Sequence, residues 1–232
     1  MRHAAHSVIL CAGPRESLGR LISASTSTGI AAADGPEPTS LSHFDPATNI
    51  LTMLGVGYDT AGNQTTYGSL TLEYDAESRI SVVKNSGSPY VSYAYDGEGW
   101  RVKKAANGVT TYYVYDALGR PAVEYSDEVP TSQGSSYLFT DMLGSVRTIT
   151  DQSGAVVECY DYLPFGRMLE SGSHGRSSCY PNPPDVGYSN RTPQKFTGKE
   201  RDNETGLDYF GARYFSAPQG RFTSVDPKLT GV

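Results

Sequence analysis

A short motif recurs about every twenty residues through the middle of the chain and limits the folds that the chain can adopt. Each copy has an aspartate, usually after a tyrosine, and most copies have a glycine three residues later. The aspartates are Asp59, Asp75, Asp96, Asp116, Asp141 and Asp161, and the glycines are Gly62, Gly99, Gly119 and Gly144; Ser78 and a displaced Gly166 stand in the other two copies. Repeats of this length are single supersecondary units that become stable by packing on their neighbours.

The local chemistry of each copy predicts a β-hairpin. Aspartate with glycine three residues later is typical of a type I turn, whose aspartate carboxylate accepts backbone N–H hydrogen bonds. A glycine with positive φ then makes a bulge that suits a hairpin. Asn107-Gly108 predicts a type I′ turn at the opposite end of one hairpin, and residues 85–88 and 151–154 are expected to turn in the same way. We therefore predict an all-β fold in which consecutive antiparallel hairpins, with strands of roughly six to seven residues, form a curved open sheet.

Neither face of the predicted strands is purely apolar. One strand alternates between Val109, Thr111, Tyr113 and Tyr115 on one side and Thr110, Tyr112 and Val114 on the other. A compact sandwich normally has one apolar face on each strand. The pattern instead favours a large sheet that is exposed to solvent on both faces and stabilised by cross-strand tyrosine pairs.

The C-terminal run from Phe196 to Pro227 is dense in glycine, aromatic residues and paired charges. This run closely resembles the RHS repeat-associated core domain of bacterial RHS/YD-repeat proteins, and the Tyr-Asp repeats resemble the same family. The matching core residues are Gly198, Lys199, Glu200, Arg201, Asp202, Gly206, Leu207, Tyr209, Arg213, Tyr214, Gly220, Arg221 and Phe222. In that family the repeats wind as a β-ribbon into a hollow shell that the core domain closes, so the resemblance implies that this chain is a segment of such a shell.

The composition and the resemblance together divide the chain. Residues 1–40 lack any sustained hydrophobic period and are expected to be an irregular or disordered leader without a convincing signal peptide. Residues 41–135 are expected to hold the repeats, and residues 136–227 the core domain. Four prolines predict an inserted surface loop over residues 168–194. The number of repeats is small, so we expect a truncated copy without a C-terminal toxin; a secreted or cell-surface location is suggested by the resemblance alone.

Composition argues against several kinds of site. The net charge of −6 disfavours nucleic-acid binding, and no stretch approaches the roughly 18 apolar residues of a membrane span. Cys11, Cys159 and Cys179 do not suggest a disulfide framework, and no metal or cofactor motif is expected. An acidic group could hold calcium, although the alternating basic residues favour salt bridges; it consists of Glu200, Asp202, Glu204 and Asp208.

Asp226 is the candidate catalytic residue. Toxin-carrying members of the family have an aspartyl self-cleavage site in the core domain, and the resemblance places Asp226 at the start of that motif. The resemblance places the second acidic motif of that site after Val232. We therefore favour Asp226 as a turn residue before Pro227 and expect no self-cleavage. The leading interpretation is a structural shell segment whose partners are the remainder of a shell or a toxin cargo. The alternatives are an aspartyl self-cleaving module and a carbohydrate-binding surface repeat, since tyrosine faces stack on sugars.

Overall fold

The computed structural model describes residues 36–119, 121–127, 134–169, 171–172, 175–176, 178–180 and 192–226. Within these residues the strands form three antiparallel sheets, and the only helical elements are 3-10 turns such as η1 (Leu41–His43) and η3 (Phe196–Gly198). No helix in this part of the chain is both long and apolar enough to cross a membrane. The all-β prediction is confirmed.

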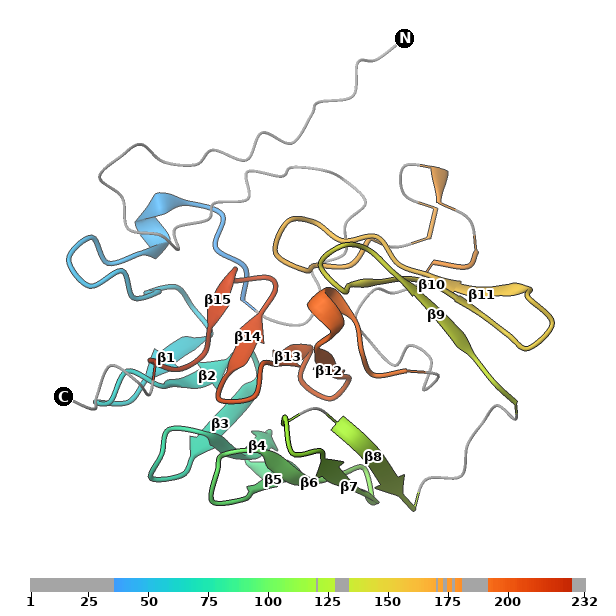
Figure 1. Cartoon of the computed structure of the whole chain (residues 1–232). Coiled ribbons are helices and arrows are strands. Elements are labelled where there is room, and N and C mark those ends of the chain that lie inside the picture. Colours follow the sequence, from blue (N-terminus) through green and yellow to red (C-terminus); the bar gives the residue numbers. More distant parts are fainter. Residues whose placement is uncertain are drawn as a thin grey trace, which may run out of the picture.

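The repeats form an eight-stranded sheet whose strands follow one another in chain order (Figure 1). Each strand pairs with the next in the sequence, as consecutive hairpins require. The strands are β1 (Val56–Tyr58), β2 (Gln64–Tyr67), β3 (Leu70–Tyr74), β4 (Ile80–Asn85), β5 (Ser88–Tyr95), β6 (Arg101–Ala106), β7 (Val109–Tyr115) and β8 (Pro121–Ser126).

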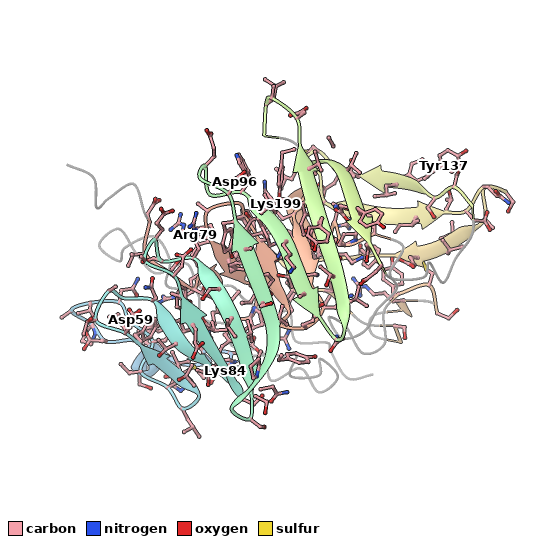
Figure 2. All side chains as sticks on the ribbon, turned by 90° about the horizontal axis from the view of Figure 1, so that it is seen from below. Asp59, Arg79, Lys84, Asp96, Tyr137 and Lys199 are labelled. Carbon is pink, nitrogen blue, oxygen red and sulfur yellow. A yellow bond between two sulfur atoms is a disulfide. The ribbon has the colours of Figure 1, made fainter. Side chains whose placement is uncertain are left out.

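The turns at the two ends of these hairpins differ in chemistry. At one end lie the aspartate turns: Asp96 Oδ1 accepts hydrogen bonds from the N–H groups of Glu98 (3.0 Å) and Trp100 (2.9 Å), and Gly99 has φ +88°. At the other end Asn107 and Gly108 have φ values of +53° and +79°, as a type I′ turn requires. Figure 2 shows Asp59 and Asp96 at one end of the strands and Lys84 toward the other end.

Two smaller sheets follow. A three-stranded sheet is ordered β11-β10-β9 and comprises β9 (Tyr137–Thr140), β10 (Val146–Thr150) and β11 (Val156–Cys159). A four-stranded sheet is built from the C-terminal motif and comprises β12 (Glu200–Asp202), β13 (Leu207–Tyr209), β14 (Tyr214–Ser216) and β15 (Arg221–Phe222). The four-stranded sheet lies against the eight-stranded sheet in both overall views (Figures 1 and 2).

The main core lies between these two sheets. Leu207, Tyr209 and Tyr214 of the small sheet pack against buried side chains of the repeats, namely Tyr67, Leu72, Ile80, Val83, Val91, Tyr93 and Ala106. The opposite face of the repeat sheet is open, with Tyr112 47% and Val114 55% exposed. The expectation of a sheet exposed to solvent on both faces was therefore wrong. The C-terminal motif, about a hundred residues further along the chain, covers one of the faces.

Cys159 and Cys179 also differ from expectation, since they form a disulfide across 20 residues with their Cα atoms 5.2 Å apart. The Cys159 N–H also donates a 2.8 Å hydrogen bond to the Cys179 carbonyl, so the chain at Cys179 is attached to β11. The expected leader lies mostly outside the described residues. Within its last part, Glu37 pairs with Arg167 at 2.6 Å.

Asp161 does not form the predicted turn. The reverse turn that follows it runs from Leu163 to Gly166, where the Gly166 N–H donates to the Leu163 carbonyl at 2.9 Å. The Asp161 carboxylate instead pairs with Arg147 (2.5 Å) and Arg176 (3.0 Å). The two-residue insertion moves the glycine beyond the reach of the aspartate, so the sequence pattern is retained only in part.

Candidate functional site

The candidate site is a buried set of charges between the repeat sheet and the four-stranded sheet. It consists of Arg101, Lys104, Glu200, Asp202 and Glu204, which we name the Arg101 cluster. The side chains of Arg101 and Asp202 are fully buried. A charge that is removed from water in this way must be paired and hydrogen-bonded for the fold to tolerate it.

Register explains how an arginine enters the core at this point. Tyr95 pairs with Arg101 in the same way that Tyr74 pairs with Ile80 one repeat earlier, so Arg101 takes the place of a buried isoleucine. Arg79, which the sequence pattern equates with Arg101, instead stays at the turn and pairs with Asp75 at 2.8 Å.

A β-bulge then brings a second cation to the same face. The register shifts between Ala94 and Tyr95, which pair with Lys103 and Arg101, so one extra residue of β6 is accommodated. Strand alternation after this shift directs Lys104 inward with Arg101, and Lys103 lies over the ring of Tyr112 on the open face.

Three carboxylates of the C-terminal motif meet these two cations. Arg101 contacts Asp202 at 2.8 Å and Glu200 at 2.5 Å. Lys104 lies 3.0 Å from Asp202, 3.5 Å from Glu200 and 3.6 Å from Glu204. Glu200 and Asp202 are two residues apart on β12 and therefore face the repeat sheet together. The arrangement directly joins residues that are about a hundred positions apart in the chain.

Tyrosines enclose the Arg101 guanidinium. Its carbon lies 5.3, 4.9 and 4.4 Å from the ring centroids of Tyr93, Tyr113 and Tyr209, within the range of cation–π attraction. The Tyr93 hydroxyl donates to Asp202 at 3.0 Å, and the Tyr113 hydroxyl donates to Glu200 at 2.9 Å. Burial raises the pKa of Tyr93, so its hydroxyl stays protonated and serves as a donor.

The carboxylates of the cluster are not equivalent. Burial alone would raise the pKa of Asp202, but the charges of Arg101 and Lys104 hold that pKa below its ordinary value. Burial raises the pKa of Glu204, and repulsion from Asp202 raises it further. Because three carboxylates face two cations, Glu204 is the charge that the cluster compensates least.

Arg201, which lies between Glu200 and Asp202 on β12, makes a second buried ion pair. Arg201 binds Asp208 through two hydrogen bonds of 2.9 and 2.7 Å, and neither side chain reaches solvent. Arg201 also donates to the carbonyl of Gly166 at 2.9 Å, in the turn beyond the three-stranded sheet. Strand β12 therefore binds the repeat sheet with one face and this turn with the other.

The remaining core-motif residues stabilise the sheet's far side and its turns. Arg213 stacks on Phe222 with 3.9 Å to the ring centroid, and Arg221 donates to the Asn49 carbonyl at 2.8 Å. Lys199 lies 5.5 Å from the ring centroid of Phe210. Gly198, Gly206 and Gly220 have φ between +63° and +69°, and Leu207, Tyr209 and Tyr214 are buried. The expected salt bridges are present, but those of Glu200, Asp202 and Glu204 are made with the repeats and not within the motif.

Four of the other predicted turn aspartates accept backbone hydrogen bonds as Asp96 does. The carboxylate of each lies 2.9 Å from the N–H two residues ahead for Asp59, Asp75, Asp116 and Asp141. The glycines at these turns have positive φ, namely Gly62, Gly119 and Gly144. These geometries fit the turn roles that the sequence suggests.

Asp226 lies at the edge of the four-stranded sheet. Its carboxylate is 3.1 Å from Arg213, and its side chain is 41% exposed. Asp202 and Asp208, the aspartates nearest to it in the motif, are both fully buried in ion pairs with other cations. The expectation that Asp226 is a turn residue and that the chain does not cleave itself stays a prediction.

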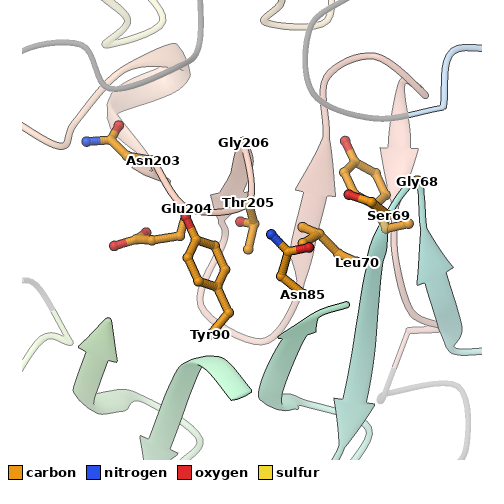
Figure 3. A pocket seen from close by; sticks show the side chains of 10 residues that line it. Gly68, Ser69, Leu70, Asn85, Tyr90, Asn203, Glu204, Thr205 and Gly206 are labelled. Atoms are coloured by element: carbon orange, nitrogen blue, oxygen red, sulfur yellow. The ribbon is translucent and has the colours of Figure 1, made fainter. Parts of the chain in front are cut away.

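A hollow of about 230 Å³ lies beside the Arg101 cluster, where the two sheets meet at their turns (Figure 3). The repeat sheet contributes the turn at Gly68 and Ser69 together with Asn85 and Tyr90. The four-stranded sheet contributes the turn over residues 203–206. Sequence reasoning missed both this hollow and Arg101. Arg79 and Arg120 follow the aspartate of their repeats by four residues, whereas Arg101 follows Asp96 by five. This offset is the signal that could have revealed Arg101.

Comparisons with known proteins find similar sequences and a similar structure within much larger proteins. No family model matches the chain. The chain is 30% identical over 193 residues to the tRNA nuclease WapA of Bacillus subtilis (strain 168), a match that covers 74% of this chain and 8% of that protein. It is 32% identical over 117 residues to the toxin subunit YenC1 of Yersinia entomophaga, covering 49% of this chain and 10% of that protein.

A solved structure shares the fold. The crystal structure of TcdB2-TccC3 matches 74% of this chain with a TM-score of 0.53 and 20% sequence identity, over 10% of its own length. The chain thus spans about a tenth or less of each of these proteins.

Proposed function

Because the chain belongs to the RHS/YD-repeat family, we propose that it forms a structural segment in the wall of a larger bacterial shell protein. In this proposal the repeat ribbon is the wall and the four-stranded sheet is the element that fastens and covers one of its faces. The partners are the remainder of the shell and a toxin cargo that the shell holds.

The observation that carries the proposal is the Arg101 cluster. An enzyme site needs its charged groups within reach of a substrate, whereas Arg101 and Asp202 have no exposed side-chain surface. Such a pair, enclosed by tyrosines and joining distant parts of the chain, suits a fixed junction. The names tRNA nuclease and toxin subunit belong to the relatives. Our proposal gives this segment the scaffold role in a protein of that kind.

The disulfide supports a location outside the reducing cytoplasm. Disulfides such as Cys159–Cys179 persist in secreted, periplasmic or cell-surface proteins and are rare where thiols are kept reduced. This agrees with the secreted or cell-surface location that we propose.

The proposal is tested by imaging the natural polypeptide that contains these residues. An antibody raised against residues 36–226 would capture it from its source, and electron cryomicroscopy would locate the segment. We expect the eight-stranded sheet to continue into the wall of a hollow particle. A particle without a cavity, or a segment that projects from the particle as a separate appendage, would contradict the proposal.

A matched pair of variants adds a biochemical readout. Arg101→Met is expected to make an enclosed cargo accessible to added protease, because it loosens the junction between the two sheets. Lys103→Met, which alters the open face of the same strand, is expected to leave the cargo protected.

A further inference from the structure

We propose that the hollow between the two sheets binds one neutral sugar unit of a larger saccharide. This inference is independent of the shell proposal. The hollow measures about 230 Å³, the space of roughly eight water molecules at about 30 Å³ each. That space suits a single sugar ring and is smaller than the roughly 300 Å³ at which pockets for drug-sized ligands begin.

The lining has the mixture of groups that sugars need. Tyr90 brings a half-buried aromatic ring from the start of β5, and Leu70 adds an apolar patch. Figure 3 shows Tyr90 and Asn85 rising from the repeat sheet toward the turn that carries Thr205. An aromatic face packs against the C–H side of a sugar ring, while amides and hydroxyls bind its hydroxyl groups.

Several of these polar groups have hydrogen-bonding capacity left. Within the described residues, the Tyr90 hydroxyl, the Ser69 hydroxyl and the Asn203 amide make no hydrogen bond to the protein. The Thr205 hydroxyl accepts from the Leu207 N–H at 3.2 Å and keeps its own proton to donate. A side-chain amide carries a donor and an acceptor side by side, which matches two neighbouring hydroxyls of a sugar.

Charge narrows the class of ligand. Glu204 borders the hollow, but its carboxylate lies 3.6 Å from Lys104, in a cluster with one more carboxylate than cations. Among the residues that the structure describes, no lysine or arginine lines the hollow. An anionic sugar would therefore be repelled without a compensating cation. A cationic ligand would meet a carboxylate that is already directed toward Lys104, so a neutral sugar fits best.

The test is ligand-observed nuclear magnetic resonance on the whole protein. The probes are the methyl glycosides of glucose, galactose and N-acetylglucosamine, with glucuronic acid as the anionic comparison. At least one neutral glycoside is expected to bind saturably with Kd on the order of 1 mM or tighter. Glucuronic acid is expected to bind at least about tenfold more weakly.

Variants assign the site. Tyr90→Ala and, on the opposing turn, Asn203→Ala are each expected to weaken binding at least about tenfold. Tyr125→Ala, which removes a tyrosine that is 69% exposed on β8, is expected to leave binding unchanged. The Asn203 residue is exposed, so this variant decides the question even where Tyr90→Ala lowers stability. Absence of saturable binding by all three neutral glycosides, equal binding of glucuronic acid, or parental affinity in Asn203→Ala would each overturn the proposal.

Discussion

Replacing Arg101 with methionine isolates the contribution of the buried cation, because methionine keeps an unbranched apolar side chain in its place. The change leaves Asp202 fully buried, with Lys104 at 3.0 Å and the Tyr93 hydroxyl at 3.0 Å, but without the arginine at 2.8 Å. Breaking a buried ion pair from one side costs about 3–5 kcal/mol. Since Lys104 and Tyr93 remain, we expect the lower end, about 3 kcal/mol. For a chain of this size that corresponds to about 6 to 12 °C in melting temperature.

The assay is equilibrium urea unfolding, followed by tyrosine fluorescence and by circular dichroism. Lys103→Met is the matched control, because it removes a cation from the open face two residues further along β6 and is expected to change stability by no more than about 0.5 kcal/mol. The double variant Arg101→Met with Asp202→Asn should recover part of the loss, since it no longer buries an uncompensated charge. If Arg101→Met unfolds at the same urea concentration as Lys103→Met, the cluster does not stabilise the junction.

Three further predictions concern a turn, a charge and the disulfide. Gly119→Ala is expected to cost about 1–2 kcal/mol, because φ is +71° and the new Cβ would lie 2.6 Å from the Trp100 ring; Gly97→Ala, with open space around it, should melt like the parent. Burial, and then repulsion from Asp202, raise the pKa of Glu204 above its ordinary value of about 4.3. Protonation of Glu204 therefore stabilises the folded state below about pH 4.3, and this stabilisation is lost as the pH rises through the raised pKa. Glu204→Gln should therefore raise the melting temperature at pH 7 but not at pH 4, and an equal shift at both values would contradict this. Cys159→Ser should cost about 3 kcal/mol, as loop closure over 20 residues predicts, and an unchanged midpoint after reduction of the parent would refute it.

The sequence was informative where structure depends on a few neighbouring residues. The hairpins between Asp59 and Tyr115 and the type I′ turn at Asn107-Gly108 follow from local chemistry, and the structure confirms both. Asp161 shows the limit of such reasoning, since two inserted residues were enough to remove its turn.

Features that depend on distant contacts could not be predicted in the same way. The alternation of Tyr113 and Tyr112 was visible, but nothing within β7 reveals that the C-terminal motif covers only the first of them. The placement of Arg101 and Lys104 on one face depends on a bulge in β6, and a shift of one residue in a strand reverses which face each side chain occupies. The sequence suggests that the carboxylates of residues 200–204 pair with their basic neighbours. The cations that contact Asp202 are instead Arg101 and Lys104 of β6.

The central claim is that the repeat sheet and the four-stranded sheet form one cooperative unit joined by the Arg101 cluster. Native-state hydrogen exchange with mass spectrometry tests this most directly, because it reports the opening free energy of each segment separately. We expect the amides of β5 to β7 and of β12 to β14 to exchange with the same high opening free energy, and Asp202→Asn to lower both by the same amount. Faster exchange of β12 to β14 than of the repeats, or a loss of protection in only one of the two sheets in Asp202→Asn, would contradict the account.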